Sequence, residues 1–156
     1  ETHLYLGRKY KLKVNVDSKE KVVATRGVLN IFTKDKDRDR VQNLVEKWYR
    51  EKAEEYFSKS LSKCFGKFEK MGFDKPGLKI RKMKTRWGSY STKGRVTLNL
   101  ELIKKPTECI DYVVMHELCH IRHRNHSKGF YKLLDKVMPE WRDKKEKLET
   151  VKKWLE

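Results

Sequence analysis

Four of the five histidines of this chain lie within eleven residues, between His116 and His126. The run begins with the pattern H-E-x-x-H, in which His116 and His120 are four positions apart. On a helix such residues lie on one face, about one turn from each other, so their imidazoles can point to a common centre. The chain is therefore expected to place one helix beside a cleft that a metal ion can enter.

The residue types in this pattern favour zinc as the metal. Imidazole nitrogens suit Zn²⁺, which takes a tetrahedral shell and in catalytic sites keeps one position open for water. Glu117 is about 100° around the helix from His116, so it is expected beside the ion, where a general base for the water has to be. The run predicts a zinc-dependent hydrolase that binds one ion, and the same donors can accept other divalent metals.

Two histidines are candidates for the third metal ligand. His123 is seven residues after His116 and would lie on the same face if the helix continued. His126 is ten residues after His116, and it can bind only if the chain leaves the helix and turns back, with Asn125 as the hinge. His126 is favoured, because two ligands from a helix and one from a turn surround an ion better than three stacked in line. His123 would then lie behind the ligands or in the cleft wall.

The residues around the motif are typical of a buried helix. Val113, Val114, Leu118 and Ile121 form an apolar face at helical spacing. Pro106 is followed by Thr and Glu, a sequence that is typical of the first turn of a helix.

Four segments also match the motifs of a known family. They are R-W-G-S at 86–89, G-R-V-T-L-N at 94–99, I-D-Y-V-V-M-H-E-L-C-H at 110–120 and N-H-S-K-G-F at 125–130. Together they resemble the YgjP-like metallopeptidase family and, more distantly, the WLM and SprT-like metalloproteases. In these families the third histidine precedes a small residue and then an aromatic one. His126, Ser127 and Phe130 match that pattern, which supports His126 as a metal ligand.

The resemblance implies an α+β, zincin-like fold, with a small twisted, mostly antiparallel sheet packed against the metal helix and additional helices around them. It implies a metal-dependent hydrolase, most simply a metallopeptidase. A strand edge above the site would then pair with extended peptide. The segment Arg95–Leu100 or its partner strand is the expected edge, although the strand can also serve only to complete the sheet.

The whole chain, 1–156, is expected to form a single metal-dependent hydrolase domain, and its hydrophobic pattern divides it into four parts. These parts are N-terminal strands over 1–35, a long helix over 36–71, the sheet and metal helix over 78–130, and C-terminal helices over 131–156. Within them we expect a hairpin over residues 4–16, a strand over 28–32, and two strands over 78–83 and 95–100 that are joined across glycines 88 and 94.

Five further residues are candidates for contact with substrate or with the ligands. They are His123, Arg86, Trp87, Arg95 and Tyr131. Arg86, His123 and Tyr131 can stabilise the negative charge that develops during hydrolysis. Arg86 or Arg95 can bind a carboxylate or phosphate group of the substrate. Trp87 fits either the cleft wall or the core, and each arginine can also be simply solvated.

The formal net charge is +17, from 39 basic and 22 acidic residues, and it predicts salt-sensitive attraction to polyanions. Three functions are compatible with this charge. The first is a zinc peptidase that acts on peptides or proteins, including one associated with nucleic acid. The second is a metal-dependent phosphohydrolase of the nucleotide pyrophosphatase type, and the third is a basic binding module with structural zinc. The basic residues are spread along the chain, so a general enrichment in lysine explains the charge equally well.

The cysteines and the lengths of the apolar stretches indicate the cellular compartment. Cys64, Cys109 and Cys119 are odd in number and have no C-x-x-C spacing, which indicates free, buried thiols in a reducing compartment. No stretch approaches eighteen apolar residues and no apolar leader is present. The prediction is a cytoplasmic protein with no membrane contact, although the missing initial methionine leaves an earlier removed signal open.

Overall fold

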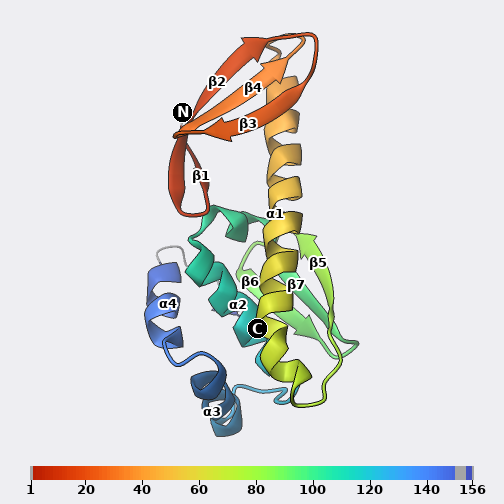
Figure 1. Ribbon diagram of the computed structural model, residues 1–156, viewed down its shortest axis with the longest axis vertical. Coiled ribbons are helices and arrows are strands. Elements are labelled where there is room, and N and C mark those ends of the chain that lie inside the picture. The colour runs from red at the N-terminus through yellow and green to blue at the C-terminus, as the bar shows by residue number, and fades with distance from the viewer. Residues whose placement is uncertain (1, 150–153, 156) are drawn as a thin grey trace.

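The computed structural model describes residues 2–149 and the backbone of residues 154–155, and it shows two small sheets joined by one long helix (Figure 1). The N-terminal sheet lies at one end of the molecule and has the strand order β1-β2-β4-β3. Its strands are β1 (Thr2–Tyr5), β2 (Arg8–Val16), β3 (Lys21–Thr25) and β4 (Val28–Thr33).

Two tight turns organise this N-terminal sheet. Leu6 and Gly7 have φ values of 49° and 81°, and Arg26 and Gly27 have values of 46° and 79°. Positive φ at both central residues is the type I′ geometry, whose twist matches that of antiparallel strands. The first turn makes the predicted hairpin over 4–16. The second pairs β4 with β3, a strand that the sequence analysis missed.

Helix α1 (Arg38–Glu69) connects the two sheets and contributes to both cores. It begins after Asp37, whose carboxylate accepts a hydrogen bond from the Arg40 N–H at 3.2 Å. Its 32 residues span about 48 Å. Near one end Tyr49 donates a hydrogen bond to the Leu4 carbonyl at 2.7 Å, and near the other end Phe68 is fully buried.

The second sheet has the order β5-β7-β6-β8, and it lies beside the helix that carries the H-E-x-x-H pattern. Its strands are β5 (Gly77–Arg81), β6 (Arg86–Ser91), β7 (Arg95–Asn99) and β8 (Trp154–Leu155). The sequence analysis missed β6 and joined β5 directly to β7. In the structure β5 and β7 are parallel neighbours and β6 returns antiparallel to β7.

The sequence analysis expected Arg95–Leu100 or its partner strand over 78–83 to form a sheet edge, or else to complete the sheet. Among the described strands, β7 has a neighbour on each side and completes the sheet, whereas its partner β5 lies at one edge. Strand β6, the other neighbour of β7, pairs with β8 at Arg86 and Gly88. Within the described chain, no strand pairs with the outer edge of β6 from Ser89 to Ser91.

Helix α2 occupies the centre of this half of the molecule. A short 3₁₀ helix, η1 (Leu100–Lys104), precedes α2 (Thr107–Cys119), and α3 (Lys128–Val137) and α4 (Trp141–Leu148) follow it. All α2 residues from Cys109 to Cys119 are buried except Asp111. Contacts with α1, α4, α3 and β6 surround the helix, so its polar side chains can only face one another, a partner helix or a cleft.

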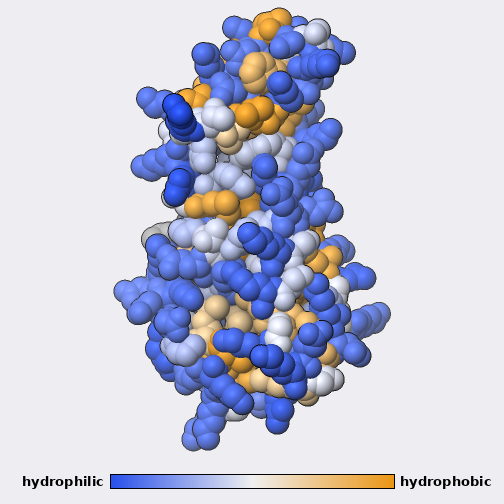
Figure 2. Space-filling view, in the orientation of Figure 1, coloured by the Kyte–Doolittle hydropathy of each residue, from blue (hydrophilic) through white to orange (hydrophobic). Residues whose placement is uncertain are grey.

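The α+β class is confirmed, and the sheets are mixed, with three antiparallel and three parallel strand pairs among the described residues. The C-terminal helices predicted over 131–156 correspond to α3 and α4, and α3 begins at Lys128. Residues 154–155 form a strand instead, and residues 150–153 and 156 lie outside the described part. In that described part, no helix combines the length and apolar character needed to cross a membrane. The face in Figure 2 is mostly hydrophilic, with hydrophobic residues in separate patches.

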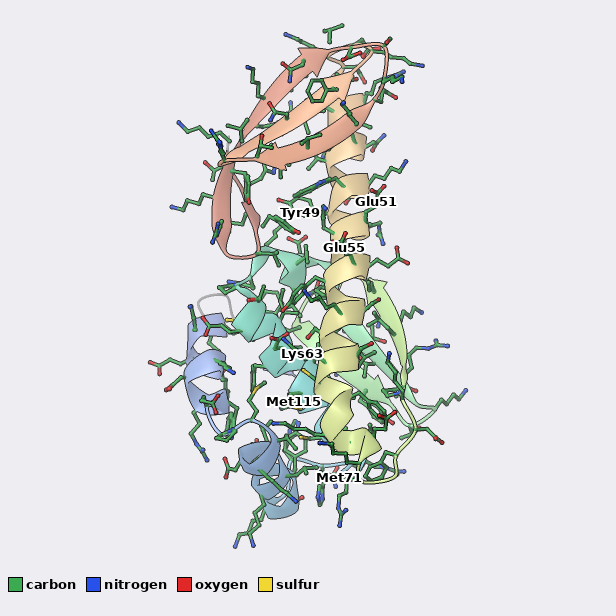
Figure 3. All side chains as sticks on the ribbon, in the orientation of Figure 1. Tyr49, Glu51, Glu55, Lys63, Met71 and Met115 are labelled. Carbon is green, nitrogen blue, oxygen red and sulfur yellow. The ribbon has the colours of Figure 1, made fainter. Side chains whose placement is uncertain are left out.

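Hydrogen bonds between side chains connect α2 to α1. The Asp111 carboxylate accepts hydrogen bonds from Ser60 at 2.6 Å, Tyr56 at 3.1 Å and Lys63 at 2.7 Å. Figure 3 places Lys63 on α1 at the level of α2. Its bond to Asp111 raises the pKa of Lys63. Ser60 is fully buried and the Asp111 side chain is only 15% exposed, so these groups depend on one another.

Replacing Asp111 with Ala is expected to lower the free energy of unfolding by about 2 kcal/mol, because the buried Ser60 hydroxyl and the Tyr56 hydroxyl lose their acceptor. Urea unfolding followed by circular dichroism measures the change. Lys63→Ala is the matched control and should cost less than about 1 kcal/mol, since the Lys63 side chain is 58% exposed. Equal effects of the two substitutions would show that Asp111 acts only through the surface ion pair.

Candidate metal centre

Helix α2 supplies two of the three histidines and the acid between them. His116 is 4% exposed and Glu117 is fully buried. The helix ends at Cys119, and His120 is its C-cap, still with right-handed helical φ and ψ. His120 therefore keeps its position one turn beyond His116, and the two ring centroids are 5.5 Å apart.

The chain turns back after α2 and brings in the third histidine. The His123 N–H donates to the Cys119 carbonyl, which closes the last turn. His126 then returns so that its Nε2 lies 3.1 Å from His116 Nε2 and 3.2 Å from His120 Nε2. Among the described residues, these three histidines are the group whose ligand atoms all lie within 4.8 Å of one another.

The spacing of these rings and the tautomer of His120 fit a bound zinc ion. Nitrogens 2.0–2.1 Å from a tetrahedral ion are about 3.4 Å apart, close to the observed distances. His120 Nδ1 lies 2.9 Å from the His123 carbonyl oxygen, which can only accept. Nδ1 therefore carries the proton, and Nε2 presents its lone pair to the other two rings.

Phe130 supports all three imidazoles from one side. Its ring centroid lies 4.9 Å from that of His116, 4.8 Å from that of His120 and 4.9 Å from that of His126. Phe130 is fully buried in the first turn of α3, whose N-cap Ser127 accepts a hydrogen bond from the Phe130 N–H. The helix start at Ser127 thus fixes both Phe130 and the adjacent His126. The sequence analysis noted these residues only as a family pattern.

Glu117 lies beside the three histidines. Its Oε1 is 4.0 Å from His120 Nε2, too far for a direct hydrogen bond. A carboxylate at this distance can accept a proton from a water molecule that is held near the converging nitrogens.

Gly88 on β6 packs directly against the Glu117 side chain. A Cβ at Gly88 would lie 3.1 Å from Val113 Cγ1, 3.2 Å from the Thr97 carbonyl oxygen and 3.3 Å from Glu117 Cγ. The sequence analysis assigned Gly88 to a turn, and that was wrong. The glycine lets β6 approach α2 closely and sets the position of Glu117.

Gly88→Ala is expected to lower hydrolysis by about tenfold to 100-fold, because the new methyl group displaces Glu117 by a fraction of an ångström. Zinc content should not change, since the three atoms nearest to that methyl group belong to Val113, Thr97 and Glu117 and none to a histidine. Steady-state kinetics and metal analysis test both expectations. Gly66→Ala is the control, because its added Cβ would meet no atom within 4 Å beyond the neighbouring residues and backbone of its own helix. Unchanged kinetics in the Gly88 variant would contradict the positioning role.

The five further residues that were predicted to contact the substrate or the metal ligands lie in different parts of the structure. The His123 ring packs on Gly129, where an added Cβ would be 2.6 Å from His123 Cε1, and the His123 carbonyl contacts His120. Tyr131 lies beside His126, with ring centroids 6.3 Å apart. Trp87 is 2% exposed and belongs to the core. Arg86 lines a separate hollow over residues 81–86, and Arg95 is exposed at the start of β7.

The cysteines of this region have no place in the metal shell. Cys119 is buried, and its burial, with the Glu117 charge, raises the pKa of the thiol to about 12. Among the described residues, the group that could hold a metal ion consists of three histidines and contains no cysteine.

A cavity of about 640 Å³ opens beside the histidines. It lies between the end of β6 and the loop that follows α2. Its lining consists of Tyr90, Thr92, His120, Ile121, Arg122, Arg124, Asn125 and His126. The cavity thus gives a substrate access to two of the three converging rings.

A helix with H-E-x-x-H, a third histidine from the next loop and an adjacent sheet define the zincin-like class of metal-dependent hydrolases. The chain belongs to the YgjP-like family: a model described as YgjP-like, metallopeptidase domain, matches residues 1–151. The resemblance seen in the sequence is confirmed. No curated protein sequence matches the chain.

Two solved structures share the fold. The metallopeptidase zymogen abylysin of Pyrococcus abyssi is 22% identical, with a TM-score of 0.56, and the match covers 64% of this chain and 99% of that one. The metallopeptidase zymogen jannalysin of Methanocaldococcus jannaschii is 20% identical, with a TM-score of 0.52, covering 60% of this chain and 87% of that one. At this identity the likeness establishes the zincin-like fold.

Proposed function

We propose that the chain is a zinc peptidase in which His116, His120 and His126 hold one Zn²⁺ ion and Glu117 is the general base. The observation that carries the proposal is the convergence of three Nε2 atoms, two of their separations being 3.1 and 3.2 Å, next to a buried carboxylate. Membership of a metallopeptidase family supports a peptide or protein as the substrate.

Zinc bound there would lower the pKa of a coordinated water and polarise the substrate carbonyl. Glu117 accepts the proton of the attacking water and delivers it to the leaving amine. The buried position of Glu117 fixes the carboxylate in place. His120 is held in the required tautomer by the His123 carbonyl.

Tyr131 is the best placed of the three candidates for stabilising the negative charge that develops on the carbonyl oxygen. Its ring lies next to that of His126 and stacks on Trp141 at 5.7 Å, which orients it. The His123 ring packs against α3, and Arg86 lines a different hollow.

The other predicted functions have less support. A structural zinc has a fourth protein ligand, and the candidate group in the described chain has three members. The family match supports a peptidase rather than a nucleotide phosphohydrolase or a nucleic-acid-binding module. The three cysteines are free and buried, which supports the proposed cytoplasmic location.

Hydrolysis of a peptide library by the zinc-loaded protein tests the proposal, with nucleotides assayed in parallel. We expect peptide cleavage that a chelator abolishes and added Zn²⁺ restores. Cleavage of nucleotides without cleavage of any peptide would overturn the peptidase assignment.

A further inference from the structure

Two arginines form the part of the cavity wall next to the metal centre. Arg122 and Arg124 lie in the loop between α2 and α3, and both are exposed to the cavity together with His126. Elsewhere on the surface arginines pair with carboxylates: Arg40 lies 3.0 Å from Glu20 and Arg142 lies 3.0 Å from Asp135.

Within the described chain, neither cavity arginine lies within ion-pairing distance of a carboxylate. Their guanidinium groups are therefore available to an acidic ligand.

The segments that line the cavity are basic, and the carboxylate beside His120, Glu117, is fully buried. Residues 75–100, which include β5, β6 and β7, contain eight lysines and arginines and no acid. Residues 118–134 contain four lysines and arginines and again no acid. None of the described residues that line the cavity is acidic. Low local negative charge makes the cavity favourable for an anion and unfavourable for a cation.

The remaining lining residues suit a side chain with a short apolar stem. Tyr90 and Ile121 supply apolar surface, whereas Thr92 and Asn125 supply hydrogen-bonding groups. A guanidinium group recognises a carboxylate through charge-assisted, often bidentate, hydrogen bonds. An aspartate or glutamate side chain therefore matches both the polarity and the charge of this wall.

We infer that this cavity selects peptides with acidic side chains next to the bond that is cleaved, and that Arg122 and Arg124 determine this specificity. The inference rests on the proposed peptidase function, since it assigns the substrate class of the same centre. It gives a local role to part of the high positive charge of the chain.

Peptide binding to the full-length, zinc-loaded Glu117→Gln variant tests the inference without cleavage. Two labelled peptides differ only in carrying Asp or Lys residues around the central bond, and fluorescence anisotropy gives their affinities. The acidic peptide is expected to bind at least about tenfold more tightly at low salt, with the difference shrinking as salt rises.

Reversing the charge of the two arginines tests whether they cause the preference for the acidic peptide. Adding Arg122→Glu and Arg124→Glu to the Glu117→Gln variant should abolish or invert its preference for the acidic peptide. Lys13→Glu with Lys59→Glu changes the net charge equally at exposed positions outside the cavity lining, and it should keep the preference. Equal binding of the two peptides, or an unchanged preference after reversal of the two arginines, overturns the inference.

Two further outcomes separate the inference from the proposed function. Displacement of the acidic peptide by ATP at lower concentration than by unlabelled acidic peptide would assign the cavity to phosphate and overturn the acidic-peptide specificity. Cleavage by the wild-type protein is measured separately. Failure to cleave any peptide would argue against the peptidase function, while the binding preference still decides which ligand the cavity takes.

Discussion

Replacement of Glu117 with Gln is expected to reduce peptide hydrolysis by about 10²- to 10⁴-fold and to leave zinc in place. The amide is nearly isosteric with the carboxylate but cannot accept the proton of the attacking water. Glu117 is fully buried and its Oε1 lies 4.0 Å from His120 Nε2, so its carboxylate is placed to take that proton.

The Glu117 variant is checked by single-turnover cleavage, metal analysis and thermal unfolding. Glu51→Gln is the matched control, because Glu51 is exposed on α1 (Figure 3) and should keep full activity. A zinc-loaded Glu117 variant that retains more than about a tenth of the wild-type rate would show that Glu117 is not the base.

Replacement of His126 with Ala is expected to weaken zinc binding by more than about 100-fold and to abolish hydrolysis at limiting zinc. Loss of a residue that only supports a ligand costs about 10- to 100-fold in metal affinity, so loss of a ligand should cost more. His126 is the ring that links the other two, with distances of 3.1 and 3.2 Å.

His123→Ala is the control that separates the two candidates for the third ligand. The His123 ring packs against Gly129 and only its backbone carbonyl contacts His120, so zinc affinity should fall by less than about tenfold. Competition with a chromophoric chelator measures both affinities. A larger loss for His123→Ala than for His126→Ala would reverse the assignment.

Local sequence patterns predicted the parts of the fold that depend on neighbouring residues. Helical spacing placed His116, Glu117 and His120 on α2, and a glycine turn predicted the first hairpin. The long helix was also recognised from its apolar stripe, which α1 buries against both sheets. In each case the pattern repeats within a few residues, so the backbone geometry alone brings the side chains together.

Strand order was not predictable in the same way. The sequence of β6, R-W-G-S-Y-S, has little of the apolar alternation that identifies a strand. It is a strand because β7 pairs with it on one side and Gly88 allows α2 to pack on its face. Likewise, β7 became a central strand through parallel pairing with β5, a contact that no local pattern encodes.

The sequence by itself determined which atoms are available to the metal centre: two imidazoles and a carboxylate on one helix, with two further histidines in reach. The tertiary structure favours His126, because it brings that ring next to the other two imidazoles. It turned the chain at the end of α2, stacked the His123 ring on Gly129 and set the Phe130 ring under the other three imidazoles. The physical reason is that ligand choice depends on packing between α2 and α3, whose contacts are fixed only when the core assembles.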